Sequence, residues 1–317
     1  MTTTISNIDT TTNTSTNIDT TNNTTINTNL IYKLNELIKV KIIARPSKIC
    51  KTPYVADIEL NNGSIVQAHC ASLGCCGLCE KDCYVYASPI NANQNNSKSK
   101  VCSYKIYLAN LYEEKIINNK LHNNNQIIGI DPKLAETLVE KALINNKLSA
   151  LKNIKKYRRE VKLENSRFDF AGIDENNKYF VLEVKNVPLA DYVDVSSKER
   201  KQMEKQGLFV NKEFNEKISY FPDGYRKKKD ECVSVRALKH INELSLLSHS
   251  KIIRPIICFV IQRTDISSFQ ASNIDPIYKA AFNEALKKGV EVIVLVISWN
   301  SNGEAHFICD NLKINDL

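Results

Sequence analysis

The 317-residue sequence has no long hydrophobic run. Its longest apolar stretch, VEVIVLVISW at residues 290–299, has the length of a β-strand and is far too short to cross a bilayer as a helix. Lys and Arg are absent before Lys33, which argues against a mitochondrial transit peptide, and the same segment lacks the apolar core of a secretory signal. We therefore expect an intracellular protein, in the cytoplasm or the nucleus or nucleoid, without a membrane partner.

The first 29 residues lack aromatic side chains and have almost no charge, because they are nearly all Thr, Asn, Ser and Ile. Such a segment cannot bury enough apolar surface to offset the conformational entropy that is lost when it is ordered. We expect residues 1–29 to form a disordered tail. The rest of the chain is long enough for roughly two ordinary domains.

Short apolar and polar runs alternate from Leu37 to Tyr107, with turn residues between them. The NNG triplet at residues 61–63 is typical of a β-hairpin turn. Several short strands separated by turns predict a small all-β unit, a barrel or partial barrel, over residues 30–115.

The hydrophobic period changes after Ile130. Asp131 is suited to an N-cap and Pro132 to the first helical position, and the apolar residues that follow share one helix face. Further along, helical patterns at residues 235–247 and 276–288 alternate with apolar strands at 255–262 and 290–299. This alternation predicts a mixed α/β domain over residues 116–317. The Lys/Glu-rich segment 191–220 reads as a loop or insertion that is partly helical.

Positive charge is concentrated in two segments of this chain, whose formal net charge is +8. Residues 147–167 contain eight Lys or Arg against two Glu, and YRKKK follows at residues 225–229. Such clusters suggest an anionic partner, and nucleic acid first of all. A solvated helix face is the plainer interpretation.

The segment 166–187, SRFDFAGIDENNKYFVLEVKNV, contains an aspartate and a Glu-Val-Lys triplet in two runs that otherwise read as core strands. Side chains alternate across a strand, so Asp169 lies opposite to its Phe neighbours, and Glu183 and Lys185 share one face of the next strand. If the strands pair through the DENN turn, the apolar residues form a core face. The two carboxylates and the lysine then meet on the other face.

Two carboxylates beside a lysine form a hard oxygen site suited to Mg²⁺ or Mn²⁺, with a cation that can orient a water or stabilise a phosphate. This is the arrangement that a metal-dependent phosphodiesterase requires. For a third carboxylate we favour Glu160, with Glu136 and Glu140 as rivals on the preceding helix. The alternative is a surface hairpin that shows an ordinary Asp, Glu and Lys to water.

Five segments resemble, in order, those of the sugar fermentation stimulation protein family (SfsA): EVKLENSRFDF, LEVKNVPLA, YFPDG, RALKHINEL and DPIYKAAFNEALKKGVEVIVL. The similarity runs from about Ile38 to Ser298, so it covers nearly the whole foldable chain. The resemblance implies an OB-like β-barrel followed by a domain like the PD-(D/E)XK nucleases, in a protein associated with DNA.

The resemblance also implies roles for particular residues. Asp169, Glu183 and Lys185 match the nuclease-like motif, and Glu160 matches the family's Glu in EV. The family's R-x-x-K-H helix corresponds to Arg236, Lys239 and His240, and a polar cluster after the next strand corresponds to Gln262, Arg263 and Asp265. Together with the basic segment, these matches give the expected DNA contacts: Arg158, Arg159, Arg167, Arg236, Lys239, Gln262 and Arg263.

The chain also departs from the family. Ala237 stands where the family's helix usually has Gly, and residues 225–233 and much of 191–220 look inserted beside the presumed cleft. The insertions could add DNA contacts or obstruct the cleft.

The ten cysteines need not form a disulfide scaffold, since a chain of this length has ample apolar residues for a core. A cluster within fifteen residues comprises His69, Cys70, Cys75, Cys76, Cys79 and Cys83. A structural zinc site needs four closely spaced ligands, but the second C-x-x-C of a zinc ribbon is missing. Small buried thiols in a barrel are therefore favoured over zinc.

Three functional hypotheses follow. The leading one is a protein that binds DNA, duplex and largely by electrostatics, with a Mg²⁺- or Mn²⁺-binding nuclease-like site that hydrolyses phosphodiesters. The second is a non-catalytic DNA-binding regulator of sugar metabolism with the same fold. The last is an OB-type single-strand binder, which needs exposed aromatics among Tyr54, Tyr84, Tyr86, Tyr104 and Tyr107. No oligomeric state follows from the sequence.

Overall fold

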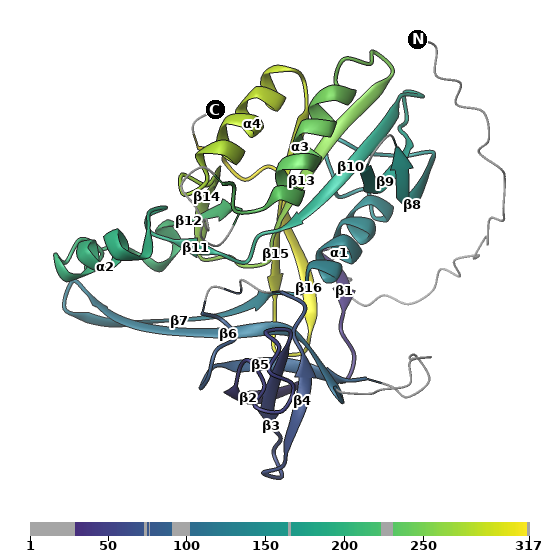
Figure 1. Ribbon diagram of the computed structural model, residues 1–317. Coiled ribbons are helices and arrows are strands. Elements are labelled where there is room, and N and C mark those ends of the chain that lie inside the picture. Colours follow the sequence, from purple (N-terminus) through teal and green to yellow (C-terminus); the bar gives the residue numbers. More distant parts are fainter. Residues whose placement is uncertain are drawn as a thin grey trace, which may run out of the picture.

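The computed structural model describes residues 29–72, 75, 77–90, 102–163, 166–222 and 231–315 (Figure 1). The expected disordered tail, except for Asn29, lies outside the described residues, and so does the basic cluster at 225–229. Within the part of the chain that the structure describes, no helix is both long enough and apolar enough to span a bilayer.

Five strands in the first part of the chain form an OB-like β-barrel. Neighbouring strands pair antiparallel in the order β4-β3-β2-β5-β6, and a parallel pairing of β4 with β6 closes the ring. The expected hairpin at NNG joins β3 to β4, and Gly63 at the turn has a φ of 80°. The strands are β2 (Ile38–Ala44), β3 (Val55–Glu59), β4 (Ile65–His69), β5 (Tyr84–Pro89) and β6 (Tyr104–Ile117).

The last barrel strand continues into a long hairpin. β6 pairs antiparallel with β7 (Lys120–Gly129) from Leu108 opposite Gly129 to Ile117 opposite Lys120. The hairpin leaves the barrel and reaches toward α2, in the part of the molecule that also holds β11 and β12 (Figure 1). The first sheet therefore runs past residue 115, where we expected the first domain to end, because the polar run HNNNQ in β7 carries no apolar alternation.

The second domain is a mixed α/β unit built on a seven-stranded sheet of order β1-β16-β15-β13-β10-β9-β8. The central strands β10, β13 and β15 are parallel and almost continuously buried, as strands covered on both faces usually are. The members of the sheet are β1 (Leu30–Lys33), β8 (Lys156–Leu163), β9 (Ser166–Ile173), β10 (Tyr179–Asn186), β13 (Ile253–Ile261), β15 (Glu291–Trp299) and β16 (Glu304–Cys309).

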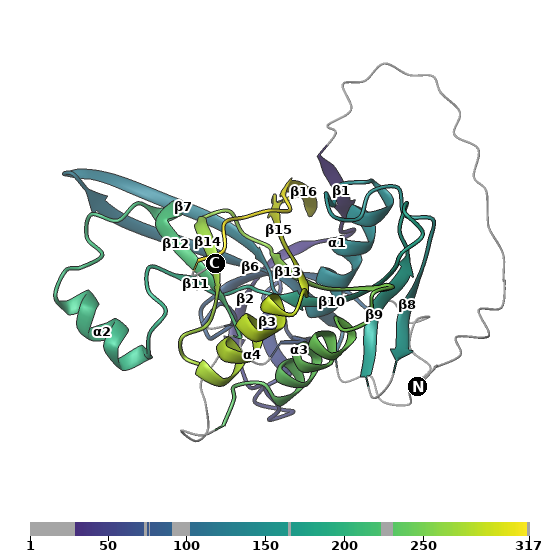
Figure 2. The same ribbon diagram turned by 90° about the horizontal axis from the view of Figure 1, so that it is seen from above.

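Helices cover both faces of this sheet (Figure 2). α1 (Pro132–Ile144) begins at the expected cap, where the Asp131 side chain accepts a hydrogen bond from Lys133 N, and packs on one face. α3 (Val235–Leu247) and α4 (Pro276–Lys287) pack on the other face, at the positions that the sequence predicts. The sheet thus separates two hydrophobic cores.

A smaller sheet of order β11-β12-β14 flanks the α3/α4 side. The Lys/Glu-rich segment is partly helical, as expected, because Ser196 and Glu199 form a capping box at the start of α2. Its elements are β11 (Ala190–Asp191), α2 (Ser197–Lys205), the 3₁₀ helix η2 (Phe214–Glu216) and β12 (Lys217–Phe221), and β14 (Ile266–Ala271) completes the sheet.

A buried polar contact joins the barrel to the second domain at Gly129. The Gly129 amide donates to the Gln262 carbonyl (3.2 Å), and the Gln262 side chain lies directly against the glycine Cα. A Cβ at this position would lie 1.8 Å from Gln262 Oε1. The close approach of these two segments of the chain therefore needs a glycine at position 129.

We expect Gly129→Ala to destabilise the protein by about 1–3 kcal/mol, because the new methyl group forces Gln262 away from its hydrogen-bond partners. Urea unfolding measures the loss. If the clash is the cause, the same substitution should cost clearly less in a Gln262→Ala background, where the methyl group finds space. An equal cost in both backgrounds would assign the effect to the backbone of residue 129 instead.

Candidate metal and nucleic-acid site

The expected hairpin is present: β9 and β10 pair antiparallel from Ile173 opposite Tyr179 to Phe170 opposite Leu182. The ladder ends there, and the Asp169 carboxylate accepts a hydrogen bond from Val184 N at 2.7 Å. Simple alternation also fails at this point, because Phe170 packs in the α1 core whereas Phe168 packs in the α3/α4 core. Asp169 thus lies at an irregularity of β9 and is tied to the backbone of β10.

Glu183 and Lys185 share one face of β10, as the alternation predicts. Glu183 is 2% exposed, and its Oε1 accepts a hydrogen bond from Lys185 Nζ at 2.5 Å. His240 of α3 contacts the same oxygen through Nδ1, which lies 3.2 Å from Lys185 Nζ. The second carboxylate oxygen, Glu183 Oε2, is buried and has no hydrogen-bond partner among the described residues. An unpartnered buried carboxylate oxygen is costly unless a cation or water binds it.

The two carboxylates of the site differ in their ionisation. Burial, then the charge of Glu183, raises the pKa of Asp169 to about 7. Burial also acts to raise the pKa of Glu183, but the hydrogen bond from His240 and the charge of Lys185 outweigh it and lower that pKa. The site therefore holds one firmly ionised carboxylate beside a second that a nearby cation would ionise fully.

The third carboxylate that we favoured lies in a different environment. Glu160 has a φ of 53° in β8, and its carboxylate is 41% exposed and pairs with Lys133 (3.0 Å) and Arg167. Glu136 of α1 is more buried, pairs with Lys133 and Arg159, and is one of the charges that raise the pKa of Asp169. Of the two acids, Glu136 is therefore the one with a direct electrostatic link to Asp169.

The basic residues expected to bind DNA divide into two groups. The first group is exposed and lies on β8, β9 and α3: Arg158, Arg167, Arg236 and Lys239. Arg159 is turned inward: its guanidinium pairs with Glu140 at 2.7 Å and with Glu136 at 3.1 Å, and it lies over the Phe170 ring. Three of the four exposed residues lie on β9 and α3, the elements that carry Asp169 and His240.

Gln262 and Arg263 are not surface donors, contrary to the sequence-based expectation. Gln262 is completely buried; its amide donates to Asn186 Oδ1 (2.8 Å) and accepts from Trp299 Nε1 (2.9 Å). Arg263, 2% exposed, binds Asp265 through Nε (2.6 Å) and Nη2 (2.7 Å). Both side chains use their donors within the protein, so they leave the set of DNA-contacting residues.

Asp265 also lies at the centre of a buried ion cluster between the two domains. Lys217 of β12 approaches it at 2.8 Å and pairs with Glu113 of β6 as well. Asn124 of β7 donates to the same carboxylate at 3.2 Å. This cluster fixes the long hairpin of the barrel to the second domain.

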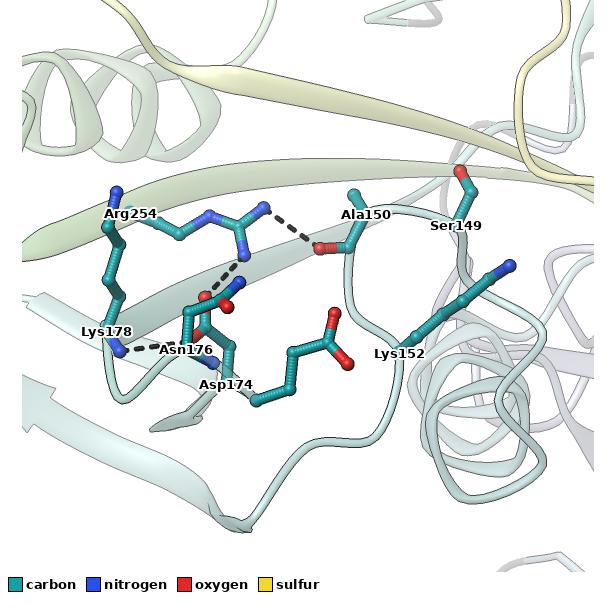
Figure 3. Close-up of a pocket in the computed structure, with 8 residues that line it drawn as sticks. Ser149, Ala150, Lys152, Asp174, Asn176, Lys178 and Arg254 are labelled. Carbon is teal, nitrogen blue, oxygen red and sulfur yellow. Dashed lines mark hydrogen bonds and ion pairs between the residues drawn. The ribbon is translucent and has the colours of Figure 1, made fainter.

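A polar cavity of about 310 Å³ lies at the turn of the β9–β10 hairpin, at the opposite end from Asp169 (Figure 3). Arg254 occupies its wall, where it binds Asp174 at 2.7 Å, Glu291 at 2.7 Å and the Ala150 carbonyl at 2.9 Å. These partners satisfy Arg254, and Lys152 and Lys178 also line the cavity. The cavity is separate from the carboxylate site, because Asp169 lies at the other end of the hairpin.

The cysteine cluster is part of the barrel. Cys70, Cys75 and Cys79 are buried together, whereas His69 is half-buried and Cys83 donates to the Gly77 carbonyl at 3.2 Å. Cys76 lies outside the described residues. The sequence pattern singled out the segment, but it could not show which of the sulfurs meet.

Comparisons with known proteins agree with this architecture. A family model described as the sugar fermentation stimulation protein RE domain matches residues 133–197 and 204–303. A sugar fermentation stimulation protein homolog of Crocosphaera subtropica is 30% identical over 275 residues, covering 84% of this chain and 91% of that protein. A homolog of Clostridium novyi is 27% identical over 263 residues, covering 82% and 90%.

A solved structure shares the fold. It is the structure of Pyrococcus furiosus SfsA in complex with Ca²⁺, which matches with a TM-score of 0.65 at 19% identity and covers 90% of this chain and 99% of that one. The resemblance in the sequence, the family match and the fold therefore lead to one conclusion: the chain belongs to the sugar fermentation stimulation protein (SfsA) family.

Proposed function

We propose that this protein binds DNA and that its second domain carries a divalent-metal site that hydrolyses phosphodiesters. The observation that carries the proposal is the pair Asp169 and Glu183 with the unpartnered buried oxygen Glu183 Oε2. Carboxylate oxygens are the preferred ligands of Mg²⁺ and Mn²⁺, and the Pyrococcus furiosus SfsA structure is a complex with Ca²⁺, which also takes oxygen ligands. The motif resemblance to PD-(D/E)XK nucleases supports the same chemistry.

The residues fit a hard cation. Asp169 and Glu183 would hold it, and Glu136 is the better placed of the third carboxylates, with Glu160 still a candidate. When bound, such an ion supplies a Lewis acid that lowers the pKa of a bound water and offsets charge on a phosphoryl oxygen. Lys185, kept in place by Glu183 and His240, can orient a water or donate to the negative charge that develops on the phosphate.

A second candidate function is DNA binding without catalysis, in an intracellular regulator of sugar metabolism as the family's description suggests. One observation favours it: Lys185 and His240 already bind Oε1 of Glu183, so partners within the protein compensate part of its charge without a metal. In that case the exposed basic residues act through electrostatics alone. The OB-like barrel offers only weak support for binding of single-stranded nucleic acid. Tyr54 and Tyr84 are 42% and 49% exposed and available for stacking, but Tyr86 is buried.

The test is an assay of binding and cleavage on duplex and single-stranded DNA, with Mg²⁺, Mn²⁺ or chelator. Cleavage that needs the metal supports the nuclease proposal. Binding with no cleavage in any metal supports the regulatory alternative, and the absence of both overturns the proposal that DNA is the partner.

We expect Arg236→Ala to weaken DNA binding uniformly across sequences and to reduce the slope of log affinity against log salt by about 1, because one phosphate contact is lost. Arg236 is exposed on α3, four residues before His240. Fluorescence anisotropy at several salt concentrations measures both effects. Lys198→Ala on α2 is the matched control, since it removes one exposed positive charge far from the carboxylates. An equal effect of the two substitutions would mean that net charge, and not this face, governs binding.

A further inference from the structure

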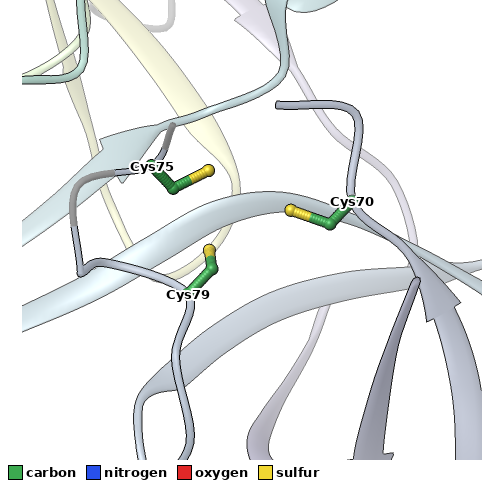
Figure 4. Close-up of side chains that lie close together, drawn as sticks. All are labelled: Cys70, Cys75 and Cys79. Atoms are coloured by element: carbon green, nitrogen blue, oxygen red, sulfur yellow. The ribbon is translucent and has the colours of Figure 1, made fainter. Parts of the chain in front are cut away.

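Three cysteines of the barrel direct their sulfurs toward one point (Figure 4). Cys70 directly follows β4, and Cys75 and Cys79 lie in the connection from β4 to β5. Their sulfur atoms all lie within 4.8 Å of one another, and the residues are 0%, 2% and 0% exposed. Sequence spacing favoured separate buried thiols over a metal site, but spacing alone could not reveal this convergence.

We propose that Cys70, Cys75 and Cys79 bind Zn²⁺ as thiolates, in a structural site that fastens the β4–β5 connection to the barrel. Zinc takes cysteine sulfur at about 2.3 Å in tetrahedral geometry, which places two sulfurs of one ion about 3.8 Å apart. Sulfurs that already lie within 4.8 Å of one another need only small rotations to reach that geometry. The fourth position is left to a water or another donor.

Arg45 supplies the charge that such a site needs. Its Nε donates to the Pro53 carbonyl at 2.9 Å and its Nη2 donates to the Ser72 carbonyl, which holds the guanidinium where its charge acts on Cys70 and Cys75. One Zn²⁺ and three thiolates carry a net charge of −1. A single guanidinium therefore neutralises the group, and a buried charge left without such compensation would be unfavourable.

Among the described residues, these thiols have few hydrogen-bond acceptors outside their own cluster. Cys70 and Cys75 each have one weak acceptor, the Ser72 carbonyl, at 3.9 and 3.6 Å from the sulfur. Thiolate is the metal-binding form of cysteine. Inert thiols packed in an apolar core would not require a guanidinium beside them.

This site is independent of the proposed nuclease-like function. It consists of soft sulfur ligands in the barrel, whereas the carboxylate site consists of hard oxygen ligands in the second domain. A failure of one proposal therefore does not affect the other.

The experiment uses the full chain, purified under reducing conditions without chelator, and measures its metal content by mass spectrometry. We expect about one zinc per chain. Reduced and stripped protein should then take up one Co²⁺, with the sulfur-to-metal charge-transfer absorption of several thiolates and the visible bands of a tetrahedral ion, and Zn²⁺ should displace it. Zinc should also raise the melting temperature and protect the peptides of all three cysteines from alkylation.

Variants locate the ligands. Cys75→Ser should lower cobalt affinity by 100-fold or more, whereas Cys83→Ser, in the same connection but outside the cluster, should leave it unchanged. If Cys75→Ser does not fold, the cobalt spectrum and the alkylation pattern of the unaltered chain still decide. A reduced chain that binds neither zinc nor cobalt, or zinc binding that leaves these three thiols reactive, overturns the proposal.

Discussion

Replacing Glu183 with glutamine should lower metal-dependent DNA cleavage on the order of 100-fold or more and leave DNA binding almost unchanged. The side chain is 2% exposed, and glutamine has the same size and shape, so the substitution leaves no cavity. What is lost is the negative charge that would hold the cation and that binds Lys185. The surface that we propose for DNA binding consists of exposed basic residues, which the substitution leaves unchanged.

Cleavage rates at saturating Mg²⁺ or Mn²⁺ measure this effect, and calorimetric titration of the metal without DNA measures the loss of the ion directly. Glu175→Gln is the matched control, because Glu175 lies at the turn of the same hairpin, far from Asp169. Full activity in Glu183→Gln would remove Glu183 from the metal site. If the unaltered chain does not cleave DNA, the metal titration alone tests the assignment.

Asp265→Ala should cost about 3–5 kcal/mol of unfolding free energy, the largest stability effect that we expect from one substitution. Asp265 is 3% exposed and holds both Arg263 and Lys217, which are themselves 2% and 3% exposed. Its removal leaves two buried cations without their principal partner, and Glu113 can bind only one of them. Urea unfolding measures the loss, and Asp82→Ala, which breaks the exposed pair with Lys41, is the control that should leave the stability almost unchanged.

The pH dependence of this difference provides a further check. Burial acts to raise the pKa of Asp265, but the hydrogen bonds and charges of Arg263 and Lys217 outweigh it and lower that pKa below its usual value. A group with a lowered pKa stabilises the fold above its unfolded pKa and loses that contribution as the pH falls. The difference in unfolding free energy between the unaltered protein and Asp265→Ala should therefore be largest above about pH 5 and decrease below about pH 4. A gap that stays constant in acid would show that Asp265 acts through packing and not through its charge.

Elements with strong local signals could be predicted from the sequence. α1, α3 and α4 follow from their caps and apolar faces, and the β9–β10 hairpin follows from alternation around a polar turn. β8 was not predicted, because its basic residues resemble a charged surface segment. In the structure they alternate along a half-exposed edge strand.

The sequence predicts the part of the candidate site that lies within the β9–β10 hairpin. Glu183 and Lys185 are two residues apart, so alternation alone places them together. The irregularity at Asp169, the contact with His240 and the link to Glu136 depend on residues from other elements. Gln262 and Arg263 resemble surface donors in sequence. Their burial shows only in the structure, where Gln262 binds the distant Asn186 and Trp299, and Arg263 binds the neighbouring Asp265 and the distant Pro188 carbonyl.

The edge strand β1 makes the second domain discontinuous in sequence. It pairs with β16, almost at the other end of the chain, before the barrel begins at β2. The barrel is thus an insertion between the first strand of the sheet and the remaining six. During synthesis β1 cannot pair until β16 has been made, so the sheet is complete only when nearly the whole chain has left the ribosome. A fragment that begins at residue 130 lacks β1 and would expose the edge of β16. A better minimal second domain would keep β1 and replace the barrel with a short linker.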